Sequence, residues 1–190
     1  VTDAGFGVIN WQASASTTSG GNWLSLSPTT GTQNEPLAVR VTLGTLAAGT
    51  YSGNVQVSSP GANGTPKNIP VTLTVTPPLP LISTGGVQNN ASYQRAASSL
   101  APGSIAAIFG TNLTDGRSCL PPSCGPTLVN GRLGTSMVGS SVTVNGVAAP
   151  FFYATPNQLG VQIPAELGPG TVDVRVTVEN RQGAAQAIAI

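Results

Sequence analysis

The chain has 190 residues, of which only 7% are charged, and its 7 basic and 6 acidic side chains leave a net charge of +1. This balance offers no basic field to a phosphate backbone and no acidic field to cations, which argues against nucleic acid as a partner. With 24 Gly, 16 Pro and few charged helix formers, the composition predicts an all-β protein of one or two domains.

The first part of the chain reads as short strands. Alternating apolar and polar residues, bounded by Gly, Pro or Asn, predict strands at 7–14, 37–43, 51–58 and 69–76, at the spacing of a small sandwich. Pro77, Pro78 and Pro80 follow, and they interrupt pairing because proline cannot donate to a ladder. We therefore expect a first domain at 1–76, a Pro-rich linker at 77–81 and a second domain at 82–190.

The second part is also predicted to be made of strands. They are expected at 104–109, 141–144, 148–153, 160–163, 171–178 and 185–190. Asn145 and Gly146 lie between apolar runs, and this pair predicts a two-residue hairpin because both residues accept the positive φ of a type I′ turn. Residues 92–99 have room for one or two helical turns, and almost no other helix is expected.

Two cysteines lie in the Pro-rich segment "CLPPSC". We expect Cys119 and Cys124 to form a structural disulfide, worth roughly 2 kcal/mol by the chain-entropy estimate. A redox-active pair would need two intervening residues and a helix N-terminus, and neither is present. The disulfide and the start at Val1 rather than Met favour a secreted protein. No apolar run approaches the roughly 18 residues of a membrane span.

Catalysis is not expected. The chain has no His, which removes the usual general base and the commonest metal ligand. Its six carboxylates show no pairing that suggests shared acid and base work: Asp3, Glu35, Asp115, Glu166, Asp173 and Glu179. Asp115 beside two thiols is a poor zinc set, and no calcium loop appears. We predict no catalytic residue, no cofactor site and no metal site.

Blocks of the sequence resemble two known families. Trp11, "NWLSLSPTTGT" from Asn22, "LAAGTYSGNVQV" from Leu46 and "NIPVTLTV" from Asn68 resemble a BACON domain. The segments "GGVQNNASY", "APGSIAAIFGTNL", "SVTVNGVAAPFFYATPNQLGVQIP" and "TVDVRVTVEN" are similar to an IPT/TIG-like C-terminal domain of large secreted soil-bacterial proteins. The resemblance implies two tandem immunoglobulin-like β-sandwiches in an elongated chain.

The resemblance also exposes two departures, one at each end. A BACON domain ordinarily begins with an additional strand before the segment that here starts at Val1. Relatives of the second domain usually continue past the final strand, whereas this sequence stops at Ile190. We therefore expect the first sandwich to lack one strand, which leaves unpaired backbone groups over core side chains.

The sequence indicates two roles for carbohydrate, as a bound ligand and as a covalent modification. BACON domains have been proposed as sugar-binding modules, and Trp11 and Tyr51 are the candidate glycan contacts, although both are also compatible with core or turn positions. Three N-glycosylation acceptor patterns begin at Asn63, Asn90 and Asn112. With so few ionised groups, a glycan coat would help to keep the chain soluble.

The sequence thus favours a secreted, non-enzymatic structural protein, a subunit of a filament or surface layer joined head-to-tail by strand complementation. Either terminal segment could donate the strand, and the candidate residues are Phe6, Val8, Trp11, Ala187, Ile188 and Ile190. The expected partners are copies of itself, or neighbouring domains if the missing strand lies upstream in one longer chain. The alternative function is a carbohydrate-binding or adhesion module of a larger secreted protein.

Overall fold

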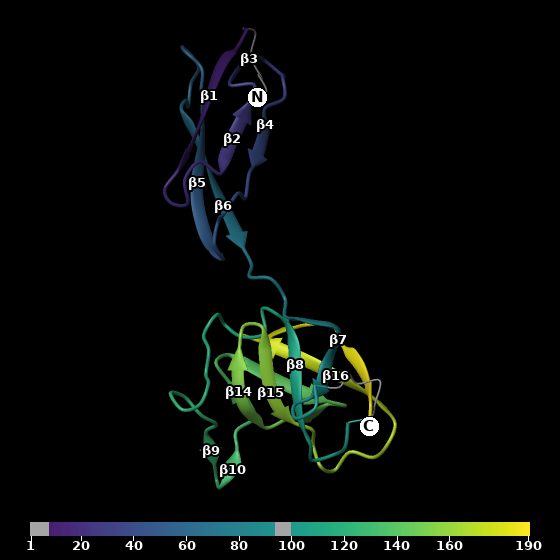
Figure 1. The fold of residues 1–190 in the computed structure, drawn as a ribbon. Coiled ribbons are helices and arrows are strands. Elements are labelled where there is room, and N and C mark those ends of the chain that lie inside the picture. The colour runs from purple at the N-terminus through teal and green to yellow at the C-terminus, as the bar shows by residue number, and fades with distance from the viewer. Residues whose placement is uncertain (1–7, 94–99) are drawn as a thin grey trace. The chain divides into compact units, whose positions relative to one another are not determined.

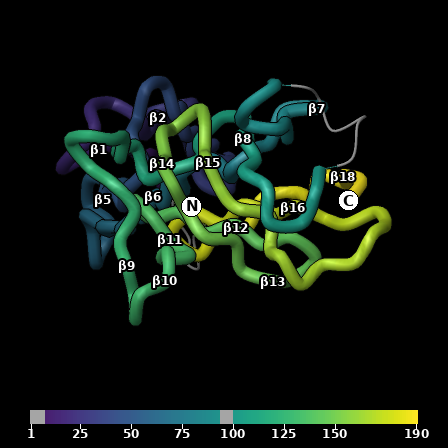
Figure 2. Tube along the Cα trace, turned by 60° about the horizontal axis from the view of Figure 1, so that its bottom comes forward, coloured from purple at the N-terminus to yellow at the C-terminus, as the bar shows by residue number. Residues whose placement is uncertain are grey.

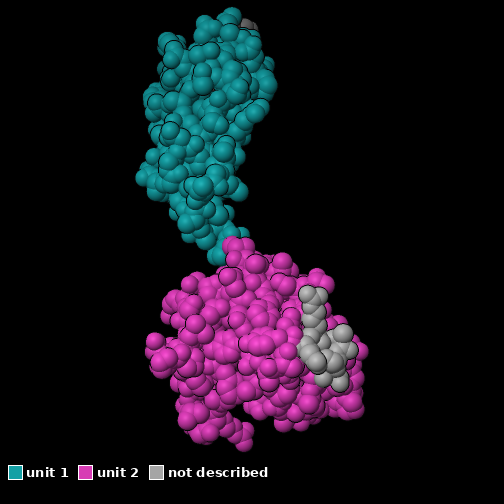
Figure 3. Space-filling model, in the orientation of Figure 1, with its two compact units in different colours: residues 1–77 teal, residues 78–190 magenta. Residues whose placement is uncertain are grey.

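The computed structural model describes residues 8–93 and 100–190 and divides the chain into two compact units, Val1–Pro77 and Pro78–Ile190 (Figure 3). All regular elements of the described residues are strands, which confirms the predicted all-β class (Figure 1). Within the described part, no helix is long and apolar enough to cross a membrane. The helical turns predicted at 92–99 fall largely outside the described residues.

Unit 1 is a sandwich of two unequal sheets. Its strands are β1 (Asn10–Thr17), β2 (Leu24–Ser27), β3 (Thr30–Thr32), β4 (Ala38–Val41), β5 (Gly49–Ser58) and β6 (Lys67–Val75). One sheet has the order β3-β1-β5-β6, and the other contains only β2 and β4. Between them lies a small core around Trp23, Leu24 and Val55.

Unit 2 has a larger core between two sheets. Its principal strands are β7 (Leu81–Asn89), β8 (Ile105–Thr111), β12 (Ser140–Val144), β14 (Phe151–Thr155), β15 (Gln158–Gln162), β16 (Thr171–Val178) and β18 (Gln186–Ala189). The short strands are β9 (Leu128–Val129), β10 (Arg132–Leu133), β11 (Ser136–Met137), β13 (Val147–Ala148) and β17 (Arg181–Gln182). One sheet has the order β14-β15-β8-β7, and the other is built around β12 and β16. Phe151, Ile108 and Leu159 are among the largest side chains of the enclosed core.

Two turns show how local sequence determines this fold. Asn145 and Gly146 have φ values of 51° and 81° and join β12 to β13, as predicted. The same pair of residue types at Asn130 and Gly131, with φ values of 51° and 75°, joins β9 to β10. This second hairpin, which was not among the predicted strands, projects from the body of unit 2 in both views (Figures 1 and 2).

The predicted strands differ from the observed ones in several places. The first begins at Asn10 rather than at residue 7 and extends to Thr17, because β5 pairs with it as far as Gly53. Strands β2 and β3 were not predicted, and the strand predicted at 148–153 is divided into β13 and β14 at Ala149 and Pro150. Strand β7 was not predicted either. Its Gly85-Gly86 pair interrupts the apolar pattern, and its register with β8 shifts between Ile82 and Val87.

Candidate functional site

The small sheet of unit 1 ends at β4, whose second edge has no partner among residues 8–93 and 100–190. Leu24 pairs with Val41, and the Thr42 N–H donates to the Trp23 carbonyl over 2.8 Å. Hydrogen-bonded and non-hydrogen-bonded pairs alternate along an antiparallel ladder, so the backbone N–H and C=O groups of Val39 and Val41 point away from β2. Among the described residues, β4 pairs with no other strand.

The side chains on β4 show that the core itself is open at this edge. Val39 and Val41 lie opposite Leu26 and Leu24, and directly opposed residues share one face of a sheet. That face points into the sandwich, since Leu24 is only 6% exposed. Yet Val39 and Val41 remain 49% and 47% exposed. The free edge of β4 therefore combines unpaired backbone groups with inward-facing valines that the described residues leave half uncovered.

Strand β6 is also an edge strand, but it is protected. Ile69 lies opposite the core residue Val55 and is 51% exposed, so this edge of the sandwich is open too. Pro70 lacks a backbone donor, and Lys67 is charged, and both features discourage strand addition at an edge. The segment Ala38–Val41 also contains one charged residue, Arg40, which lies between the two valines on the opposite face, but it contains no proline and keeps every backbone donor. Strand β4 is therefore the better acceptor of the two.

The residues predicted as strand donors lie in different environments. Phe6 lies outside the described residues, Val8 is exposed, and Trp11 is buried within β1. In the C-terminal tail, residues 183–190, Ala187 and Ile188 belong to β18, which pairs with β16.

The end of the tail is held as well. Ile190 exchanges two backbone hydrogen bonds with Gly170, at 2.8 and 3.0 Å, and packs against the core of unit 2. The tail is thus part of the unit 2 sandwich, whereas Val8 precedes the first paired residue among those described in unit 1.

The two nominated glycan contacts are not exposed platforms. Trp11 is 1% exposed, and a Cβ at Gly31 would meet its ring, so the absence of a side chain at Gly31 makes room for the indole. The indole N–H of Trp11 has no partner among the described residues. Tyr51 packs against the core of unit 1, and its hydroxyl donates to the Ala47 carbonyl over 2.8 Å. Stacking of a sugar on either ring would require rearrangement.

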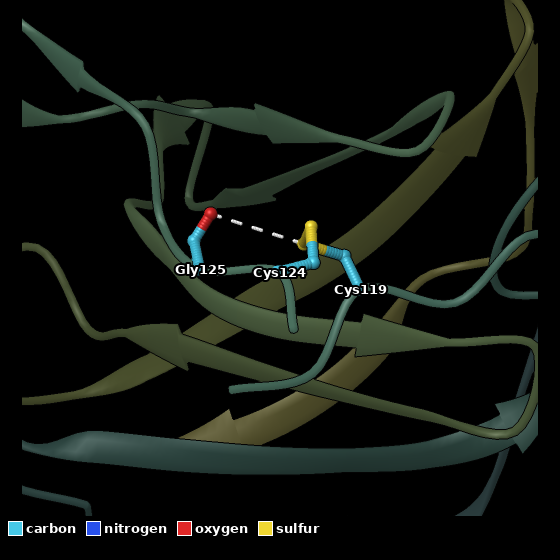
Figure 4. Close-up of a disulfide and its surroundings, with 3 residues drawn as sticks. All are labelled: Cys119, Cys124 and Gly125. Atoms are coloured by element: carbon cyan, nitrogen blue, oxygen red, sulfur yellow. Dashed lines mark hydrogen bonds between the residues drawn. A yellow bond between two sulfur atoms is a disulfide. The ribbon is translucent and has the colours of Figure 1, made fainter. Parts of the chain in front are cut away.

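The two cysteines form the predicted disulfide, which supports the loop before the β9–β10 hairpin (Figure 4). Their Cα atoms are 4.9 Å apart, and the Cys119 sulfur lies 3.8 Å from the Gly125 carbonyl oxygen. Cys119 is buried and exchanges two backbone hydrogen bonds with Ala154 on β14. The disulfide therefore anchors an otherwise irregular loop to a core strand.

A surface hollow of about 490 Å³ lies beside the disulfide. Cys124, Val138, Glu179 and Asn180 contribute to its lining, and Glu179 is the one ionisable side chain among the described residues that line it. A single carboxylate does not supply both an acid and a base. No cluster of three or more potential metal ligands occurs in the described part of the chain.

The nearby carboxylate Asp115 is paired with Arg117. The Arg117 side chain donates two hydrogen bonds to the Asp115 carboxylate, its Nε over 2.8 Å and its Nη2 at closer range. This hydrogen bonding is the main cause that lowers the pKa of the Asp115 carboxyl below its usual value. Asp115 is thus an ionised, structurally engaged residue near the surface.

Opening the disulfide is expected to lower the stability of unit 2 by about 2 kcal/mol, because the chain-entropy effect of so short a loop is small. The Cys124→Ser variant tests this, since Cys124 is exposed, and Ser123→Ala in the same loop is the matched control. Urea unfolding followed by circular dichroism gives the free energy of unfolding. Equal stability of the two variants would contradict an anchoring role.

The sheets, their cores and the disulfide define an all-β, immunoglobulin-like chain. Residues 91–189, in unit 2, match the model of the IPT/TIG domain family. The chain belongs to the IPT/TIG domain family. The match confirms the predicted character of the second domain, while the BACON resemblance of the first remains a prediction.

Two solved structures show weak likenesses to the chain. One is the Bacteroides ovatus mixed-linkage glucan utilization locus protein SGBP-B in complex with a mixed-linkage heptasaccharide, at 13% identity and a TM-score of 0.31. The other is the human Desmocollin-1 ectodomain, at 12% identity and a TM-score of 0.30. The matches cover 94% and 95% of this chain but only 36% and 29% of those chains. No curated protein matches the sequence.

Proposed function

We propose that this chain is a non-catalytic, extracellular structural subunit whose copies join head-to-tail by β-strand complementation at the free edge of β4. The observation that carries the proposal is the half-exposed, inward-facing pair Val39 and Val41, whose outward backbone groups have no partner in the described part of the chain. An extended segment that pairs with β4 satisfies those groups and covers the valines at the same time. The disulfide supports the extracellular setting.

Energetics indicate what kind of segment would dock. The backbone groups of Val39 and Val41 offer about four hydrogen bonds, each worth roughly 1 kcal/mol net. Covering the exposed half of each valine adds about 1 kcal/mol. Because association costs at least about 4 kcal/mol, the donor must bring apolar side chains of its own. An alternating apolar segment meets this requirement.

We assign the donor role to the N-terminal run that contains Phe6 and Val8. Val8 is exposed and precedes β1, so it can reach a neighbour without unpairing a described strand. The tail residues Ala187, Ile188 and Ile190 would first have to leave β16 and Gly170. Donation from one copy to an edge on the next is a heterologous contact, and its repetition makes an open filament where the rotation between copies does not close into a ring.

Negative-stain electron microscopy at high salt tests the proposal. With a net charge of +1, assembly driven by apolar burial should tolerate salt, and filaments are expected. Deletion of residues 1–7 should abolish them, and deletion of residues 183–190 is the comparison for the other candidate donor. If the unmodified chain stays monodisperse, strand donation between copies is wrong, and a strand supplied within one longer chain becomes the better explanation.

A further inference from the structure

The three N-glycosylation acceptor patterns occupy different environments. Asn63 is exposed in the turn between β5 and β6, and no hydrogen bond holds its side chain among the described residues. Asn112 is exposed in the bend after β8, where its φ of 55° is one that asparagine tolerates. Its side-chain amide donates only a long hydrogen bond, 3.5 Å, to the Leu79 carbonyl. Both amides are open to solvent.

Asn90 is held by its neighbours. Its side-chain oxygen accepts a hydrogen bond from the Tyr153 hydroxyl over 2.7 Å, and that hydroxyl accepts another from Gln158 over 2.8 Å. The Tyr153 ring itself lies over Gly160, where a Cβ would come within 2.2 Å of it. Asn90 is therefore the partly buried end of a network that fixes a tyrosine on the sheet of β14 and β15.

The surface around Asn112 is apolar. Leu79 and Leu81 are 57% and 56% exposed, and Thr111, the residue before Asn112, pairs with Leu81. Only 7% of the residues are charged, so ionised side chains contribute little to hydration of this surface. A carbohydrate attached to Asn112 would cover these leucines and supply hydroxyl groups in their place.

We propose that Asn63 and Asn112 carry N-linked glycans and that Asn90 does not. The co-substrate is a sugar linked to a lipid pyrophosphate, supplied by a transferase. The side-chain nitrogen of asparagine forms a bond to C1 of the sugar, the bond from C1 to the pyrophosphate oxygen breaks, and the amide proton passes to a base of the transferase. The pyrophosphate leaves with the bonding electron pair.

The acceptor hydroxyls indicate when attachment occurs. Thr114, the third residue of the Asn112 pattern, is 5% exposed, and its hydroxyl donates to the Arg117 carbonyl over 2.7 Å. A transferase cannot reach this hydroxyl in the folded chain, so attachment at Asn112 precedes folding of the segment. A glycan on Asn112 or Asn63 then stays outside as the chain folds. A glycan on Asn90 would prevent the Tyr153 contact from forming, so chains modified there fold less well and the folded protein is the one with an unmodified Asn90.

Glycopeptide mass spectrometry of the protein from its natural source tests the proposal. Peptides that contain Asn63 and Asn112 should carry hexose-type mass additions, and the Asn90 peptide should have its unmodified mass. In the natural host, Asn63→Gln and Asn112→Gln should each remove one step of the gel-mobility shift, whereas Asn90→Gln should leave it unchanged. Thr114→Ser keeps the acceptor pattern and is the matched control for Thr114→Val, which removes it.

Each outcome decides the question. Unmodified peptides at both Asn63 and Asn112 would overturn the proposal, as would a glycan on Asn90. Detection by mass does not depend on assembly, so glycosylation without filaments would support this inference while contradicting strand donation. Filaments built from unmodified protein would support strand donation and contradict glycosylation.

Discussion

The Val39→Pro/Val41→Pro double variant is expected to abolish filament assembly while unit 1 remains folded. Both backbone N–H groups point to the free edge of β4, so proline removes two donors that a docking strand would use and leaves the ladder to β2 intact. The proline rings also obstruct the approach of the incoming backbone. Together the lost donors and the obstruction should weaken association by at least about 2 kcal/mol, roughly thirtyfold.

The measurement is electron microscopy combined with light scattering at matched protein concentration. The Val39→Ile/Val41→Ile variant is the control, because isoleucine keeps both the β-branched apolar side chain and the backbone donor. Thermal unfolding followed by tryptophan fluorescence checks the fold of unit 1. If the proline variant remains folded and still forms filaments, the assembly contact lies elsewhere, and β4 is an ordinary exposed edge.

Part of this architecture could be predicted from local sequence. The alternation of Thr171–Val178 predicts β16, and the Asn145-Gly146 pair predicts the hairpin of β12 and β13, because both signals act over a few residues. Strand β7 escaped prediction because its pairing with β8 tolerates a break at Gly85-Gly86. Whether a strand can continue past such a break depends on its partner β8, which is about 20 residues away in the sequence. A local pattern therefore does not predict it.

The candidate site was only half predictable. The segment around Val39 and Val41 was recognised as a strand, but its place at the edge of a two-stranded sheet depends on pairing with Leu24 and Leu26. For Trp11 the strand was predicted but the exposure was not. It was a candidate for sugar contact, yet the residues that pack around it leave it only 1% exposed. Alternation predicts a strand, but exposure is determined by residues distant in sequence.

Phe151→Ala is expected to destabilise unit 2 by about 3 to 5 kcal/mol and leave unit 1 unchanged. Phe151 is fully buried, so truncation loses its transfer free energy and leaves a cavity in the unit 2 core. The cores of the two units share no buried residue. Because Trp11 and Trp23 are the only two tryptophans, fluorescence reports on unit 1 alone.

Differential scanning calorimetry and tryptophan fluorescence, recorded on the same samples, separate the two units. Phe151→Ala should lower the calorimetric transition of unit 2 and leave the fluorescence transition in place. Leu24→Ala should shift the fluorescence transition and the calorimetric transition of unit 1, and leave that of unit 2 in place. A common shift of the unit 1 and unit 2 transitions in either variant would mean that the units unfold as one, and the boundary at Pro77 would then not separate independent domains. Independent transitions would give each unit its own stability. Binding of a partner stabilises the folded state that it recognises. Filament assembly through β4 should therefore raise the unfolding temperature of unit 1 and leave that of unit 2 unchanged.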